Sequence, residues 1–216
     1  MGDARGAQVP AADRPAAPAW QPAVVVAVLA EAPDAVTLRL RLERPNAFLA
    51  GQYYNVRLAV AGRPRPVQRA YSVASSPLPD SSLIDLGVRE VSDGLVSPHL
   101  VRSLSVGDVL HVRGPTGRFT WTEQDGGPLL LVGAGSGVVP LVSIVRYAAA
   151  TLHGVRICMI CSAPDFDHAL YARELDALAR AHDWLRVVHV LTQDANDPRA
   201  DYHRRIDGAL LAEVLN

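Results

Sequence analysis

The chain has 216 residues, a formal net charge of -1, 49% hydrophobic residues and 20% charged residues. These values are ordinary for a globular protein with a buried core, and the near-neutral charge argues against a nucleic-acid or anionic-membrane partner. No stretch approaches the ~20 apolar residues of a membrane span, and two cysteines argue against a disulfide framework.

The N-terminal segment is rich in Ala and Pro and poor in bulky apolar residues. It lacks the apolar stretch of a secretory signal. We predict a flexible tail over residues 1–19 and a location in the cytoplasm.

The first half of the chain shows the alternation of apolar and polar side chains that is typical of strands. Residues 36–42 show it most clearly, and this pattern predicts a strand with one buried face. The other predicted strands cover residues 23–30, 52–60, 67–73, 84–88 and 106–115. Six short strands separated by turn residues predict a closed or nearly closed antiparallel β-barrel. One short helix interrupts them, with Ser97 as its N-cap and Pro98 in its first position.

The second half alternates strands and helices. The predicted strands cover residues 129–132, 155–161 and 186–192, and the predicted helices cover 138–150, 169–181 and a last segment that Asp207 caps. Uniformly apolar strands that alternate with helices predict a parallel sheet covered on both faces. We therefore expect two domains, a barrel over residues 20–124 and an α/β nucleotide-binding domain over residues 125–216.

Both cysteines, Cys158 and Cys161, fall within one predicted strand. Strand alternation places them on opposite faces. A CxxC redox motif is the alternative, but such motifs usually lie where a helix starts.

A glycine turn joins the first strand of the second half to its helix, with Gly133, Gly135 and Gly137. Glycines let the backbone approach a ligand closely, and the helix start offers unpaired N–H groups to a phosphate. The full G-x-G-x-x-G fingerprint is not met, because valine stands where the third glycine would fall. A purely structural strand–helix connection is the alternative.

Three further motifs precede that turn, in order. They are Arg69-Ala70-Tyr71-Ser72 at the end of a strand, Asp93-Gly94-Leu95-Val96-Ser97 at a helix start, and Gly114-Pro115-Thr116-Gly117-Arg118-Phe119 after the last barrel strand. The first motif alone would read as a half-exposed strand with a surface arginine. The ordered set is much more specific than any single member.

This ordered set resembles the ferredoxin–NADP reductase family, over about residues 20–216. The family patterns R-x-Y-S, G-x-[VL]-S, G-P-x-G-x-F and G-x-G-x-G-[IV]-x-P are all matched, and Tyr171, Glu174 and Leu175 match a later segment. The resemblance implies an FAD-binding β-barrel followed by an NAD(P)-binding domain. It also implies a stand-alone reductase module, since the chain has no cysteine cluster for an iron–sulfur centre.

The resemblance also implies roles for individual residues. Arg69 would pair with the FAD pyrophosphate, Tyr71 would pack along the flavin, and Ser72 would lie by the flavin N5 as the catalytic residue. The other cofactor-binding residues that it implies are Ala70, Val88, Arg89, Glu90, Gly94, Leu95, Val96 and Ser97 for FAD, and Gly133, Gly135, Ser136 and Gly137 for the nicotinamide dinucleotide.

The implied activity is hydride transfer from NAD(P)H to FAD, followed by electron transfer to a ferredoxin or an oxygenase component. Two alternatives stay open: a non-catalytic flavin-binding electron-transfer or regulatory subunit, and a plain β-barrel binding module fused to a nucleotide-binding domain. No metal site is expected, because the seven histidines are scattered.

The chain departs from the family pattern in two places. The family continues with a strand that ends in Cys-Gly-Pro, whereas this sequence stops at Asn216, so we expect FAD binding to survive better than hydride transfer. The choice between NADP and NAD is also open. Thr192 and Arg205 could hold a 2′-phosphate, while Gln193 stands where NADP-selective members often carry arginine.

Overall fold

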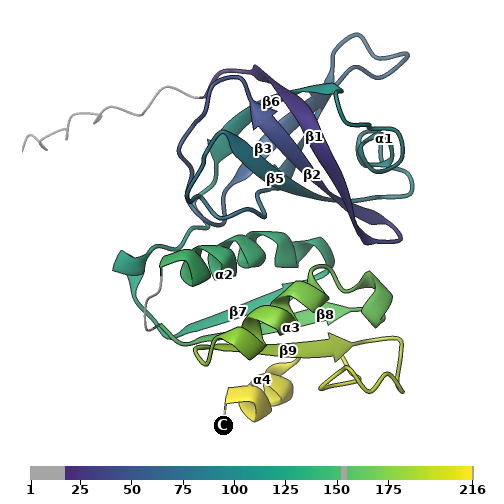
Figure 1. Ribbon diagram of the computed structural model, residues 1–216. Coiled ribbons are helices and arrows are strands. Elements are labelled where there is room, and N and C mark those ends of the chain that lie inside the picture. Colours follow the sequence, from purple (N-terminus) through teal and green to yellow (C-terminus); the bar gives the residue numbers. More distant parts are fainter. Residues whose placement is uncertain (1–17, 152–154, 216) are drawn as a thin grey trace, which may run out of the picture.

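A computed structural model describes residues 18–151 and 155–215. The predicted tail over residues 1–19 falls almost entirely outside these ranges. A β-barrel forms one end of the molecule and an α/β unit forms the other, and helix α2 lies between the barrel and the sheet of the second unit (Figure 1).

The barrel is a single antiparallel sheet. Its strands are β1 (Gln21–Ala32), β2 (Ala35–Leu42), β3 (Tyr53–Leu58), β4 (Val67–Ser72), β5 (Leu83–Arg89) and β6 (Val109–Thr116). They pair in the order β4-β3-β6-β1-β2-β5. A bridge between Val73 and Leu86 joins the two outer strands and nearly closes the sheet. The predicted six-stranded barrel is confirmed.

Alternation along the strands fills the barrel. In β2, Leu38 and Leu40 are fully buried, whereas Arg39 and Arg41 between and after them are exposed. Tyr54 of β3 enters the same core. Burial of each large apolar side chain there stabilises the fold by roughly 1.5–3 kcal/mol.

A short helix, α1 (Ser97–Arg102), packs on β5. The prediction that Ser97 caps this helix is wrong, because Ser97 is its first helical residue and Val96 is the N-cap. The Ser97 Oγ instead accepts a hydrogen bond from the backbone N–H of Val91 at 3.0 Å. Its hydroxyl therefore ties down the segment before the helix.

The second unit alternates strands and helices, as predicted. Its elements are η1 (Glu123–Asp125), β7 (Leu129–Ala134), η2 (Gly135–Val138), α2 (Val139–Thr151), β8 (Ile157–Ala163), η3 (Phe166–His168), α3 (Ala172–Ala181), β9 (Leu185–Leu191) and α4 (Gly208–Leu215). The strands pair in parallel in the order β7-β8-β9. Asp207 caps α4 as expected, since its Oδ1 accepts the N–H of Leu210 at 2.8 Å.

Helices cover the two faces of this sheet unequally. Helices α2 and α3 pack on the face toward the barrel, and α4 packs on the other face against β8 and β9. Leu130 and Val132 of β7 are 39% and 43% exposed, so the expected cover on both faces is incomplete over β7.

The two cysteines follow strand alternation. Cys161 is buried in the core beneath α2 and α3, whereas Cys158 is half-buried on the α4 side, and both are free thiols. Among the helices in residues 18–151 and 155–215, none has the length and hydropathy that a membrane crossing requires.

Candidate functional site

A cleft of about 560 Å³ opens between the end of the barrel and the start of α2. Both units contribute to its walls. The lining residues are Arg69, Ala70, Tyr71, Ser72, Gly87, Arg89, Val91, Asp93, Gly94, Leu95, Val96, Ser97, Ser136 and Val139. Most of the residues predicted to bind a cofactor are therefore brought together in one cavity.

Strand β4 supplies one wall through Arg69 to Ser72. The Arg69 side chain is exposed, its Nη1 donates to the carbonyl of Gln68 at 2.8 Å, and no carboxylate pairs with it in the described part of the chain. Burial raises the pKa of the Tyr71 phenol to about 12, partly offset by the Arg69 charge. The phenol is therefore a neutral hydrogen-bond donor at physiological pH, next to an unpaired guanidinium.

The turn before α1 supplies a second wall. The N–H of Gly94 donates to the carbonyl of Val91 at 2.7 Å, and Ser97 holds the other side of the turn. A Cβ on Gly94 would lie 2.8 Å from both the Ser97 Oγ and the Val91 oxygen, so only glycine fits here. Leu95 is exposed and Val96 is buried. The turn therefore lines the cleft with backbone atoms as well as with side chains.

The end of β5 contributes less than expected from sequence. Arg89 lines the cleft, donates to Asp34 at 2.8 and 3.1 Å, and reaches the carbonyl of His168 in the second unit at 3.2 Å. Val88 points into the barrel core. Glu90 forms a bidentate ion pair with Arg102, and neither Val88 nor Glu90 lines the cleft.

The glycine turn between β7 and α2 presents one residue to the cleft, Ser136. Gly135 has φ +52°, which favours glycine, and a Cβ on Gly133 would lie 3.0 Å from the Gly137 carbonyl oxygen. The turn is thus tightly wound, and its three glycines lie behind Ser136 without lining the cavity themselves.

The two residues predicted to hold a 2′-phosphate lie outside this cleft. The Thr192 hydroxyl, just after β9, donates to the carbonyl of Ala163 at 3.3 Å. Arg205 is exposed in the segment before α4. The structure does not bring either of them to the walls of the cavity.

Four lining residues were missed by sequence reasoning: Gly87, Val91, Asp93 and Val139. Gly87 carried a usable signal, because a lone glycine inside an apolar strand marks a close approach of another group. A Cβ on Gly87 would lie 2.6 Å from both methyl carbons of Val139. Asp93 stands in the motif before α1 but was not assigned to the cofactor, and Val91 and Val139 had no signal in residue type alone.

The arrangement suits a ligand that carries phosphate and a flat ring. An unpaired guanidinium and a glycine turn bind phosphate oxygens well, while the neutral Tyr71 phenol offers an aromatic face and a donor. The second unit reaches the same cavity at Ser136 and Val139, so a second ligand on that unit would meet the first.

Comparison with known proteins matches both units. A family model described as "Oxidoreductase FAD-binding domain" matches residues 22–121, and one described as "Oxidoreductase NAD-binding domain" matches residues 131–216. Together they cover most of the chain.

Among individual relatives, the chain is 36% identical over 156 residues to a 3-ketosteroid-9-alpha-monooxygenase ferredoxin reductase component of Rhodococcus rhodochrous, covering 72% of this chain and 43% of the relative. It is 36% identical over 188 residues to an aromatic O-demethylase reductase subunit of an Amycolatopsis species, covering 82% and 52%.

The crystal structure of an Amycolatopsis cytochrome P450 reductase superposes with a TM-score of 0.81 at 30% identity, covering 96% of this chain and 62% of that one. This chain spans about half the length of the curated relatives that it matches.

Proposed function

This chain belongs to the ferredoxin–NADP reductase family, with an FAD-binding and an NAD-binding domain, and we propose that it is an NAD(P)H-dependent flavoprotein reductase. In this proposal it takes hydride from NAD(P)H onto FAD and passes electrons on to a ferredoxin or oxygenase component. We place the domain division as in the sequence prediction, with the barrel over residues 20–124 and the nucleotide-binding domain over residues 125–216.

One observation carries the proposal. Ser72 of the barrel and Ser136 of the glycine turn line the same cavity, although they belong to different units. A reductase must bring two cofactors into contact, and holding two reactants side by side supplies much of the rate enhancement. The shared cleft is the place where such a contact can form.

The residues present fit FAD. Arg69 has no carboxylate partner among the described residues, so its guanidinium is free for the pyrophosphate. The Gly94 turn leaves no room for a Cβ and exposes backbone to the same cavity. In the proposal Arg69 and the segment Gly94–Ser97 hold the pyrophosphate, while Tyr71 packs along the flavin.

The flavin supplies the redox chemistry when it is bound, because it accepts a hydride and releases electrons to an acceptor. The chain itself binds the two cofactors, orients them and excludes water from the space between them. Ser72 ends β4 opposite Tyr53, where its short side chain lets a nicotinamide approach from the Ser136 side. In the proposal the flavin edge is also bordered by Ala70 and Arg89, with Arg89 anchored to Asp34. Val88 and Glu90, whose side chains lie outside the cleft, would contribute only their backbone.

The glycine turn is the proposed dinucleotide site. Gly133 and Gly135 keep the turn compact, Gly137 ends the motif, and Ser136 faces the cleft. Thr192 follows β9 at the same carboxyl edge of the parallel sheet as the glycine turn, and Arg205 precedes α4. We propose that these two residues hold the 2′-phosphate of NADPH. The ratio of kcat/KM for NADPH to that for NADH tests this assignment, and Arg205→Met should lower the ratio.

The partner in this proposal is an electron-acceptor protein. Support comes from relatives whose names identify them as reductase components of oxygenase systems. A cytoplasmic location is part of the same proposal, supported by two free thiols in a chain of this length.

Steady-state oxidation of NADPH and NADH by the FAD-loaded chain, with ferricyanide as acceptor, tests the proposed function. Turnover that depends on added FAD supports a reductase. A chain that holds flavin but oxidises neither nucleotide would instead be a non-catalytic flavin-binding subunit. A chain that binds nucleotide but no flavin would be a β-barrel binding module fused to a nucleotide-binding domain.

A further inference from the structure

Helix α2 is attached to the barrel by two side chains that reach the segment after β4. The Arg146 Nη1 donates to the Ala74 carbonyl at 2.9 Å, and the Ser143 Oγ donates to the Ser75 carbonyl at 2.7 Å. Ala74 and Ser75 follow Ser72 closely in the chain. The same helix begins at Val139, directly after the glycine turn.

The Arg146 guanidinium is held from several sides. Its Nε and Nη2 donate to the Glu174 carboxylate of α3 at 2.8 and 2.6 Å, and it lies 5.3 Å from the centre of the Tyr171 ring. Its Nη1 is 3.9 Å from Asp85 of β5. A planar guanidinium is the side chain that can satisfy such a set of acceptors in one fixed orientation.

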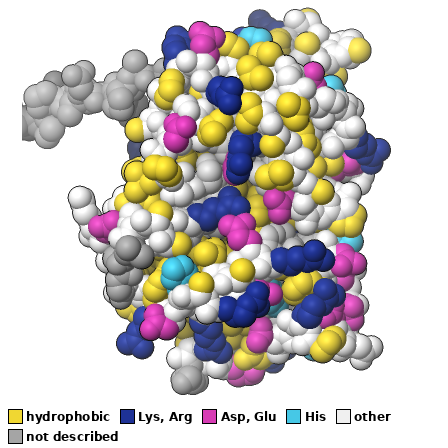
Figure 2. All heavy atoms as spheres, in the orientation of Figure 1, with side chains coloured by type: hydrophobic (Ala, Val, Ile, Leu, Met, Phe, Trp, Pro, Cys, Tyr) yellow, Lys and Arg dark blue, Asp and Glu magenta, His cyan; other side chains and the backbone are white. Residues whose placement is uncertain are grey.

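The two units approach each other closely around this arginine. Gly87 of β5 has no Cβ, and the Val139 methyl groups occupy that space. The Tyr171 hydroxyl is buried and lies 2.7 Å from the Thr37 hydroxyl of β2. Figure 2 shows basic and acidic side chains side by side across the middle of one face, where the two units meet.

These contacts join the two halves of the cleft through one rigid element. Arg146 lies seven residues after Val139, about 10 Å along the helix at 1.5 Å per residue. We propose that Arg146 is a positioning residue, which fixes the distance between the glycine turn and Ser72 by clamping α2 to the Ala74 carbonyl. The inference rests on the proposed function, because it assigns the two sides of the cleft to two cofactors.

The first test is the variant Arg146→Met, which keeps an apolar stem and removes every donor. The rate constant for flavin reduction at saturating NAD(P)H should fall at least about tenfold, because small misplacements of reacting groups are costly. The dissociation constants for FAD and for the nucleotide should change less than about threefold, because Arg146 is not in the cleft lining.

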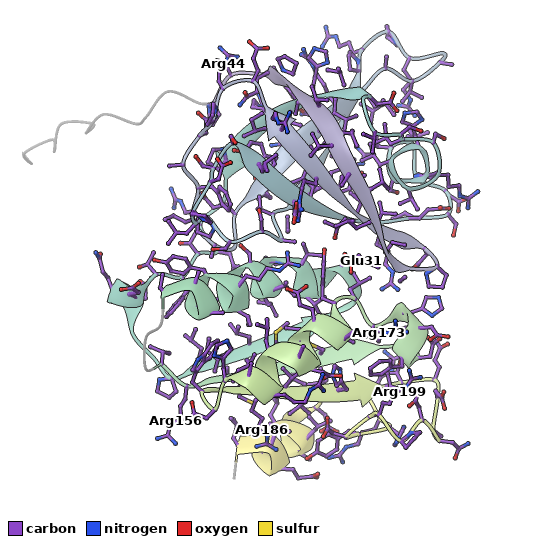
Figure 3. All side chains as sticks on the ribbon, viewed as in Figure 1. Glu31, Arg44, Arg156, Arg173, Arg186 and Arg199 are labelled. Atoms are coloured by element: carbon purple, nitrogen blue, oxygen red, sulfur yellow. The ribbon has the colours of Figure 1, made fainter. Side chains whose placement is uncertain are left out.

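Arg146→Lys should restore only part of the rate, because one ammonium can reach the Ala74 carbonyl or Glu174 but not both. The matched control is Arg186→Met. Arg186 also donates an Nη1 to a backbone carbonyl, that of Val214 at 2.8 Å, but within a single unit. It lies at the end of the molecule away from the barrel (Figure 3), so its loss should leave the rate unchanged.

A second readout does not depend on turnover. Spin labels on Val106→Cys and Ala177→Cys, at exposed positions of the barrel and of α3, report the distance between the units by double electron–electron resonance in a Cys158→Ser background. The distance distribution of the FAD-loaded chain should broaden or shift in Arg146→Met and stay unchanged in Arg186→Met.

The outcomes separate the two proposals. If neither nucleotide reduces the flavin of the unsubstituted chain, the proposed function fails, and the distance measurement alone decides on the clamp. If the unsubstituted chain is reduced and Arg146→Met keeps its rate or its distance distribution, the clamp is wrong. Should Arg146→Met not fold, Arg146→Lys takes its place, because its single ammonium cannot hold the Ala74 carbonyl and Glu174 together. A rate and a distance distribution of Arg146→Lys equal to those of the unsubstituted chain would then overturn the inference.

Discussion

Gly87→Ala tests how closely the two units must pack. The new Cβ would lie 2.6 Å from both Val139 methyl carbons and 2.9 Å from the Tyr171 hydroxyl. Ordinary contacts begin at 3.4 Å, so Val139, and the start of α2 with it, must shift away from β5 by about 0.8 Å. Overpacking of this kind costs about 1–3 kcal/mol, and a displacement near 1 Å between reacting groups lowers a rate by on the order of 10²-fold.

The assay is anaerobic stopped-flow reduction of the FAD-loaded variant by NADPH or NADH. We expect a large loss of rate that Val139→Ala suppresses in the double variant, because it removes the two nearest methyl groups. A clash with bound FAD would not be suppressed in this way. Gly208→Ala is the control, since a Cβ there meets nothing within 4 Å and the helix gains a better former. Reduction of Gly87→Ala at the rate of the unsubstituted chain would show that hydride transfer does not depend on this close packing of β5 against Val139.

Three other substitutions have defined outcomes. Arg69→Met should weaken FAD binding by about 10- to 100-fold, since a hydrogen bond to a charged group contributes about 1.5–3 kcal/mol. Fluorescence titration measures the dissociation constant, with Arg41→Met as the control. Equal affinities of the two variants would show that Arg69 does not bind FAD. Tyr54→Phe should raise the free energy of unfolding by about 1 kcal/mol in urea, because the Tyr54 hydroxyl is buried with no partner among the described residues; a loss of stability would show that the hydroxyl is satisfied. Burial raises the pKa of the Cys161 thiol from 9.0 to about 12, so only the unfolded chain loses this proton between those pH values, and the folded state loses about 1.4 kcal/mol per pH unit there. In Cys161→Ala the free energy of unfolding should fall less steeply above pH 9, by about 1.4 kcal/mol per pH unit. The same slope in both proteins would contradict a buried, protonated thiol.

Local patterns were enough to predict the elements of this fold. Alternation in residues 36–42 gives β2 its buried leucines and exposed arginines, and the spacing of Cys158 and Cys161 places them on opposite faces of β8. Asp207 caps α4 because an N-cap bond joins near neighbours in sequence. Each of these features depends on residues a few positions apart.

Features that depend on tertiary contact were beyond the sequence. Ser97 has the right chemistry for an N-cap, but its hydroxyl holds Val91 instead. Tyr171 looked like a helical residue, yet it adopts φ +59° just before α3, with its hydroxyl against Thr37 in the other unit. A glycine at position 87 indicates that some group approaches the strand closely, but only the folded chain shows that this group is Val139, which is distant in sequence.

The residues of the candidate site also fall into those that local motifs predict and those that depend on tertiary contacts. The residues of β4 and of the turn before α1 could be placed because whole motifs carry them, and they do line one cleft. The ion pair that turns the Glu90 side chain toward Arg102 could not be foreseen from the order of residues, and it leaves only the Glu90 backbone as a proposed contact.

The central claim is that the cleft holds FAD within reach of a nucleotide on the second unit. A visible absorbance spectrum tests it most directly, recorded on the chain after incubation with FAD and removal of the excess, before and after anaerobic addition of NADPH or NADH. We expect a bound-flavin spectrum whose blue absorption band bleaches with at least one of the two nucleotides. A colourless chain, or a yellow one that neither nucleotide bleaches, would contradict it.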